Sequence, residues 1–160
     1  MGDLEALKML VAHGANINEA PSHNCGRTAL QAAAALTPEA KKTTLIEFLL
    51  DHGADINADP SLLSGITALQ GAAIVGDLMV ANLLISRGAD VNAPPSFHNG
   101  RTAIEGAAEH GRLDMVRLLL NAGAIGDVTL GRGFKHAIDL AERRGYDAVA
   151  NILKAEQSRT

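Results

Sequence analysis

The side chains with the strongest ligand and nucleophile chemistry in this chain are six histidines and one cysteine. Histidine and cysteine are common zinc ligands, and three of these residues, His23, Cys25 and His98, fall in segments that we expect to form loops. Neither a C-x-x-C nor an H-x-x-x-H spacing accompanies them. Cys25 also lacks a third group that would orient His23 as its base. The sequence therefore predicts no metal site, no cofactor and no catalytic residue.

Two other features resemble functional sites but favour structural roles. Gly131-Arg132-Gly133 has the glycines of a phosphate-binding loop, but no strand pattern precedes it and no G-K-[ST] follows. His13 and His52 each stand directly before a glycine, at equivalent positions. A histidine in the last turn of a helix interacts favourably with the helix dipole, so we interpret both as helix-end residues.

The composition argues against several function classes. A formal net charge of −4 and a pI near 5.8 are unlike those of a nucleic-acid or anionic-membrane binder. A single cysteine cannot form an internal disulfide and suits a reducing compartment. The chain has neither an apolar run of membrane-spanning length nor a signal-peptide pattern. We therefore expect a soluble cytoplasmic or nuclear protein without a nucleic-acid or membrane partner.

One helical pattern occurs four times and positions all of these residues. The best copy is Gly100–Asn121, close copies begin at Gly65 and Gly26, and a degraded copy covers His136–Leu153. Equivalent helix starts are 39, 35 and 34 residues apart, at Thr28, Thr67, Thr102 and His136. Self-similarity at this period predicts a stacked-repeat architecture.

Each of the first three helix starts has the pattern of a capping box. A Thr hydroxyl accepts from the backbone N–H three residues later, while the Gln or Glu at that position reaches back to the Thr N–H. The pairs are Thr28 with Gln31, Thr67 with Gln70, and Thr102 with Glu105. Small residues follow, and glycine inside a helix costs roughly 1 kcal/mol relative to alanine. Its recurrence at Gly71 and Gly106 therefore predicts close approach between neighbouring helices.

The pattern also predicts how the chain is divided. We expect helix pairs near Thr28–Leu50, Thr67–Ser86, Thr102–Asn121 and His136–Lys154, with the apolar residues of each second helix forming the inter-repeat core. Four extra residues around Pro38 lengthen the first pair. The N-terminal segment is either cut from a longer array, which we favour, or a makeshift cap. The expected single array comprises a truncated repeat at 1–14, repeats at 15–53, 54–88 and 89–123, and a C-terminal repeat and cap at 124–160.

Two short motifs identify the repeat type. T-A-L-Q or T-A-I-E begins three units, and G-A-D-[IV]-N stands at two of the turns between them. With the G-x-x-x-V-x-x-L-L second helix, these motifs resemble ankyrin repeats over nearly the whole chain. The family's usual T-P-L-H opener is absent, which changes the opener's rigidity and hydrogen bonding. The resemblance implies an all-α helix-turn-helix solenoid with projecting hairpin-like loops. Its first helices and loop tips would line a concave face.

The resemblance also implies which residues face a partner. These are the residue after each loop glycine, including Lys135, the residues that end each first helix, including Arg143 and Arg144, and the loop tips. An apolar centre with Arg27 and Arg101 at its edges would be typical of a protein-binding site. Alternatively, the apolar loop residues fold back and cover helix ends. The candidate partner-binding residues are Arg27, Leu62, Leu63, Ile66, Ile74, Val75, Phe97, Arg101, Glu109 and His110.

The function expected from these features is protein–protein interaction. The chain would act as a monomeric, non-enzymatic module, as a fragment of a larger multidomain protein, and would bind another protein through its concave face and loop tips. Two alternatives remain. One is an enzyme or ligand-binding protein whose site is not visible in the sequence, and the other is a purely structural spacer. A spacer would have polar concave residues throughout, and the apolar side chains at Ile66, Ile74 and Val75 argue against that.

Overall fold

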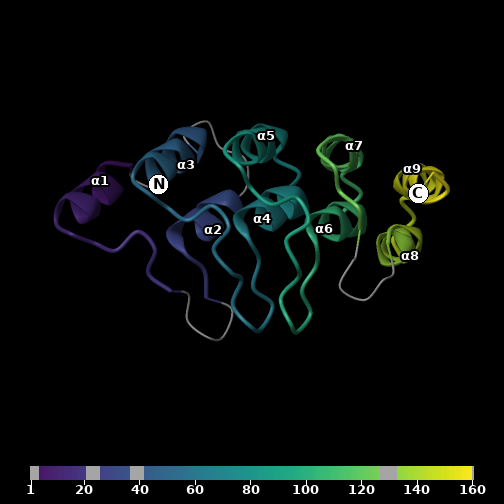
Figure 1. Ribbon diagram of the computed structural model, residues 1–160, viewed down its shortest axis with the longest axis horizontal. Coiled ribbons are helices and arrows are strands. Elements are labelled where there is room, and N and C mark those ends of the chain that lie inside the picture. The colour runs from purple at the N-terminus through teal and green to yellow at the C-terminus, as the bar shows by residue number, and fades with distance from the viewer. Residues whose placement is uncertain (1–3, 21–25, 37–41, 127–132, 160) are drawn as a thin grey trace.

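The computed structural model describes residues 4–20, 26–36, 42–126 and 133–159, and over these ranges the chain forms helices and no strands. The helices lie in two rows, with long loops projecting on the side away from the outer row (Figure 1). The inner row contains α2 (Ala29–Ala34), α4 (Ala68–Val75), α6 (Ala103–Glu109) and α8 (Lys135–Arg143). The outer row contains α1 (Leu4–Ala12), α3 (Lys42–Asp51), α5 (Leu78–Ser86), α7 (Leu113–Asn121) and α9 (Asp147–Gln157). None of the described helices is both long and apolar enough to cross a membrane. The predicted all-α fold is confirmed.

The predicted capping boxes determine where three of the inner helices begin. At α4 the Thr67 hydroxyl accepts from the Gln70 backbone N–H at 3.2 Å, and the Gln70 Oε1 accepts from the Thr67 N–H at 2.9 Å. Both contacts recur at α2 and at α6. Helix α8 differs, because its N-cap residue Phe134 makes no side-chain cap. Local sequence thus sets the first turn of α2, α4 and α6 but not that of α8.

Small residues bring the inner helices close together, as predicted. A Cβ atom on Gly71 would lie 3.1 Å from the Ala35 Cβ, and one on Gly106 would lie 2.7 Å from the Ile74 Cγ1. The apolar residues on the core-facing sides of α3, α5 and α7 are buried or partly buried between the two rows. Their fully buried members include Ile46, Leu49, Val80, Leu84, Met115, Val116 and Leu119.

Asparagine side chains join each turn of the array to the next. The Asn57 Nδ2 donates to the Gly88 carbonyl at 3.1 Å, and its Oδ1 accepts from the Asp90 backbone N–H at 2.8 Å. Asn18 and Asn92 make the same pair of contacts with the turns that follow them. This arrangement keeps the bases of successive loops in a fixed register.

A buried ion pair connects two outer helices at their N-terminal ends. The Lys42 Nζ lies 3.1 Å from the Asp77 Oδ2, and both side chains are at least nine-tenths buried. The Asp77 Oδ1 also caps α5 by accepting from the Val80 N–H at 3.1 Å. The sequence analysis did not identify this pair. Its partners come from two repeats, and the lengthened segment around Pro38, directly before Lys42, lies outside the described residues.

The N-terminal helix α1 is the least covered part of the described structure. It has no buried residue, and Met9 and Leu10 are exposed by 63% and 59%. Leu7 is partly buried and packs against the core. Helix α1 therefore has apolar side chains that no described residue covers.

Candidate functional site

A cavity of about 400 Å³ lies on the loop side of the inner helices. It is bounded by α2, α4, α6 and the bases of the loops before α4 and α6. We call it the groove. Six of the ten predicted partner-binding residues are among its lining residues, which are Arg27, Ala35, Ser64, Gly65, Ile66, Gly71, Ile74, Val75, Asn99, Gly100, Arg101 and Glu109.

The floor of the groove is apolar and shaped by small residues. Ile74 and Val75 are half-buried at the C-terminal end of α4. Ile66 was expected to be an exposed centre of the surface, but it is only 9% exposed. Its Cδ1 lies against Gly71, 3.2 Å from where a Cβ would stand, so the missing side chain of Gly71 admits the isoleucine. Ile66 therefore supports the groove floor more than it offers free surface.

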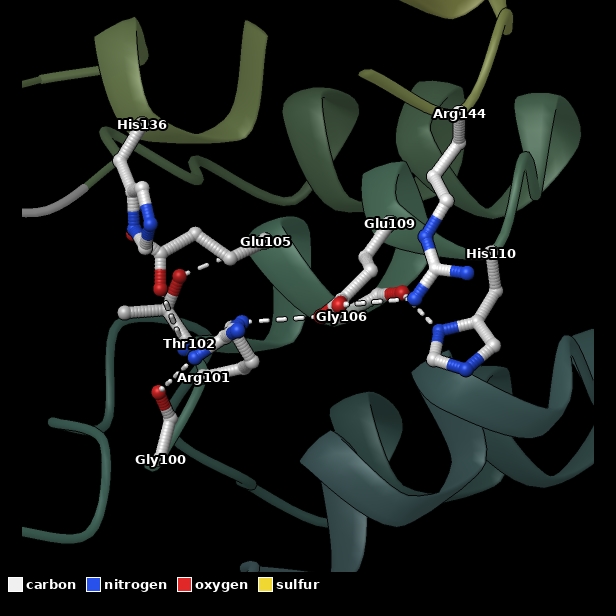
Figure 2. Close-up of polar contacts among 9 residues, drawn as sticks. All are labelled: Gly100, Arg101, Thr102, Glu105, Gly106, Glu109, His110, His136 and Arg144. Atoms are coloured by element: carbon white, nitrogen blue, oxygen red, sulfur yellow. Dashed lines mark hydrogen bonds and ion pairs between the residues drawn. The ribbon is translucent and has the colours of Figure 1, made fainter. Parts of the chain in front are cut away.

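One wall of the groove is a hydrogen-bonded ion pair. The Arg101 Nε donates to the Glu109 Oε2 at 2.9 Å, and the Arg101 Nη1 donates to the Gly100 carbonyl at 3.0 Å (Figure 2). The Arg144 Nη2 lies 3.5 Å from the other Glu109 carboxylate oxygen. Arg101 was predicted as a charge at the edge of the surface, and it lines the groove while held by Glu109.

The charge state of Glu109 follows from its neighbours. Partial burial raises the pKa of Glu109. The charge of Arg101, hydrogen bonds from Arg101 and Arg144, and a smaller contribution from the charge of His110 lower that pKa more. The net pKa lies below its ordinary value of 4.5. Glu109 is therefore a carboxylate at neutral pH, and the wall that it forms with Arg101 is a fixed, charged one.

The opposite side of the groove carries a different kind of cation. Arg27 precedes α2, is exposed, and makes no ion pair with any described residue. A free guanidinium presents up to five N–H donors in a planar fork that matches a carboxylate. Among the described residues, the groove thus has one arginine in an ion pair, Arg101, and one that forms none, Arg27.

Two loop residues that the sequence analysis missed complete the groove. Ser64 and Asn99 line it, and both have a positive φ, 51° and 56° respectively. Each stands directly before a loop glycine whose Cβ would collide with the start of its own loop, 2.3 Å from the backbone nitrogen of Ser61 or Ser96. The signal available in the sequence was their common position before the glycine.

The loop tips form a second surface that does not line the groove. Leu62, Leu63 and Phe97 are exposed by 64%, 38% and 82%, so they do not cover the helix ends. Their loops pair through the backbone, with the Ser64 N–H donating to the His98 carbonyl at 2.9 Å and the His98 N–H to the Leu62 carbonyl at 3.2 Å. The two neighbouring loops are thus joined by a single β-bridge between Leu63 and His98.

The remaining predicted residue, His110, lies outside the groove. It is exposed, and its Nδ1 lies 3.0 Å from the Gly106 carbonyl at the end of α6 (Figure 2). His13 and His52 make the equivalent contact with the Met9 and Phe48 carbonyls. All three histidines thus satisfy a carbonyl in the last turn of a helix, consistent with the helix-end role predicted for His13 and His52.

The described part of the chain holds no group of three or more His, Cys, Asp or Glu side chains placed to bind a metal ion. Two of the residues considered for zinc, His23 and Cys25, lie outside the described residues, as do Gly131 and Arg132 of the glycine-rich segment. The third, His98, lies in a loop tip, with its ring edge-to-face against Phe97 at a centroid distance of 4.8 Å.

Comparison with known families gives two matches. A family model described as ankyrin repeats (3 copies) matches residues 41–131, which is more than half of the chain. A second model, described as ankyrin repeats (many copies), matches residues 1–36. No curated protein matches the chain significantly.

Proposed function

The chain belongs to the ankyrin repeat family, and on that premise we propose that it binds a partner protein through its groove. Ankyrin repeats are generally protein-interaction modules and typically non-catalytic. The observation that carries the proposal is the groove itself. Residues that flank α2 meet there with side chains of α4 and α6, distant in sequence, around one hollow with an apolar floor and charged walls. An apolar surface rimmed by charge is typical of protein-binding sites.

In this proposal the two exposed surfaces act together. Ile74, Val75, Arg27 and the Arg101–Glu109 wall contact the partner in the groove. The loop tips at Leu62, Leu63 and Phe97, and His110 beyond the groove, add outer contacts. A single array over residues 1–160 acts as a monomeric, intracellular module of a larger protein, with the repeat boundaries given above. Because its floor is apolar, a purely structural spacer is the weaker interpretation.

A small-molecule site is the second candidate, because the volume of the groove favours it. Ligand pockets measure roughly 300–1,000 Å³, and the groove measures about 400 Å³. Native mass spectrometry of the purified chain separates the two functions. A bound small molecule that Val75→Lys displaces would support the ligand site, whereas a partner protein lost in the same variant would support the interaction module.

The proposal is tested by cross-linking the chain to its partners and quantifying them for two matched variants. Val75→Lys places a charge on the groove floor, and Met79→Lys places the same charge on the outer row, where Met79 is 71% exposed. We expect Val75→Lys to weaken capture of a specific partner by about tenfold or more, as for a central interface residue, while Met79→Lys leaves it unchanged. Thermal melting of both variants checks that the fold is retained. Equal capture by both folded variants would contradict the groove as the binding surface.

A further inference from the structure

The charge of the concave side is opposite to that of the whole chain. The formal net charge is −4. At the residue after each loop glycine and at the two residues that end each inner helix in the repeat pattern, however, five cations stand against one carboxylate, Glu109; Glu142, one position earlier on α8, pairs with Lys154. The cations are Arg27, Arg101, Lys135, Arg143 and Arg144. This segregation concentrates positive potential where the groove lies.

Most of that positive charge is not neutralised within the protein. Arg27, Lys135 and Arg143 are exposed and form no ion pair with any described residue. Glu109 is shared between Arg101 and Arg144, so this cluster of three keeps one net positive charge. The Arg144 side chain is 61% exposed and reaches Glu109 only at 3.5 Å, which leaves most of its donors available. Free cations therefore stand on both sides of the apolar floor.

We propose that the partner segment in the groove is acidic, with an aliphatic side chain seated on Ile74 and Val75 and carboxylates on either side. One carboxylate pairs with Arg27, and another pairs with Arg144 beyond the Arg101–Glu109 wall. The proposal rests on the proposed function of the same groove. Arginine and carboxylate form bidentate, charge-assisted hydrogen bonds, and positive rim charges accelerate association with an acidic partner. Lys135 and Arg143 extend the same attraction along α8.

An acidic peptide fits this surface better than a nucleic acid. The Glu109 carboxylate lies in the groove wall, where it would repel a phosphate backbone. Single-stranded nucleic acids also need aromatic side chains on which bases stack, and no aromatic residue is among the described residues that line the groove. Methyl groups of isoleucine and valine suit an aliphatic side chain instead.

The test is a selection from a random peptide library on the whole chain, followed by affinity measurements on the selected peptides. We expect the bound pool to be enriched in Asp and Glu around a Leu, Ile, Val or Met. Arg27→Glu should weaken the selected peptides by about tenfold or more, and their affinity should fall as salt rises from about 0.05 M to about 0.5 M. The matched control is Arg117→Glu, the same charge reversal on the outer helix α7, where the side chain is 58% exposed; it should change affinity by less than about twofold.

The outcomes separate this inference from the function that it rests on. A neutral or basic selected pool that Val75→Lys still abolishes would overturn the acidic partner and leave the groove as the binding surface. Peptides insensitive to both Val75→Lys and Arg27→Glu would overturn both proposals. A labelled oligothymidine that binds more tightly than the selected peptides, and is weakened by Arg27→Glu, would replace the acidic peptide with a nucleic acid.

Discussion

The interior inter-repeat contacts and the C-terminal one use the same sequence position in different ways. In the interior, the Gln70 Nε2 donates to the Ala93 and Pro94 carbonyls at 3.2 and 3.0 Å, and Gln31 donates in the same way to the carbonyls at positions 58 and 59. At the C-terminal contact the position holds Glu105. One of its oxygens still closes the capping box, while the other lies 2.8 Å from the His136 Nδ1 (Figure 2).

The difference shows that two departures from the repeat pattern depend on each other. A carboxylate accepts hydrogen bonds but cannot donate them, so Glu105 cannot hold backbone carbonyls as Gln70 does. His136, which replaces the threonine of the other helix starts, supplies the missing donor. Arg144 adds a second charged contact to Glu109 in the same interface. At the inner-helix starts, neutral hydrogen bonds join the interior repeats, and ionisable groups join the last one.

The variant Gln70→Glu should show the largest difference between the interior and the C-terminal inter-repeat contacts. The substituted carboxylate would face two carbonyl oxygens without a donor, in a site where Gln70 is 1% exposed. We expect a loss of about 2–4 kcal/mol in the free energy of unfolding, from two lost hydrogen bonds and an unpaired buried acceptor. Urea denaturation at neutral pH measures it. The reciprocal change, Glu105→Gln, should cost less than about 1.5 kcal/mol, because the amide oxygen can still close the capping box while the amide N–H donates to an unprotonated His136 Nδ1. Equal losses would mean that the two interfaces are not chemically distinct.

A double-mutant cycle on Glu105→Ala and His136→Ala measures the coupling free energy of the C-terminal inter-repeat contact. Glu105→Ala removes the capping box as well as the inter-repeat contact, so only the coupling term reports the pair. We expect a coupling of about 1–2 kcal/mol, because one partner is 4% exposed and the other is 25% exposed. A coupling near zero would show that His136 occupies this position without stabilising the interface.

The asparagine contacts are the control, because they are the same in both regions. Asn57→Ala acts on an interior turn and Asn92→Ala on the last one, and each removes one donated and one accepted hydrogen bond. We expect each to cost about 1–2 kcal/mol and the two to agree within about 0.5 kcal/mol. A much larger loss for one of them would place the difference between the regions in the turns and not in the helix starts.

The smallest expected effect is the loss of folding stability when Glu109 becomes protonated at low pH. Its pKa in the folded protein is lowered below 4.5, so its pairing stabilises the protein fully above that value. The stabilisation is lost as pH falls through the lowered pKa, because the folded state must then bind a proton that the unfolded state already holds. We expect a few tenths of a kcal/mol, since Arg144 is largely exposed and solvent screens the pair. Hydrogen exchange of α8 and α9 below pH 4.5 should rise less steeply in Glu109→Gln than in the original chain. Identical pH profiles would remove Glu109 from the interface.

The features that can be predicted from the sequence alone are those formed by residues close together in the chain and those that follow from the repeat period. The capping boxes join residues three apart, so the hydrogen-bonding groups and their geometry can both be read from four letters. Gly71 and Gly106 predicted close helix approach because glycine within a helix needs a compensating reason. The resemblance to ankyrin repeats then placed Arg27, Ile74, Val75 and Arg101 around one surface.

The contacts that those residues make across repeats are seen only in the tertiary structure. The pairing of Glu109 with Arg101 and Arg144, the burial of Ile66 over Gly71, and the contact of Glu105 with His136 each join groups from different turns or different repeats. Such contacts depend on how far one repeat is shifted and rotated against the next. Side-chain volumes at the helix interfaces set that shift, and a one-dimensional pattern of residue types does not contain it.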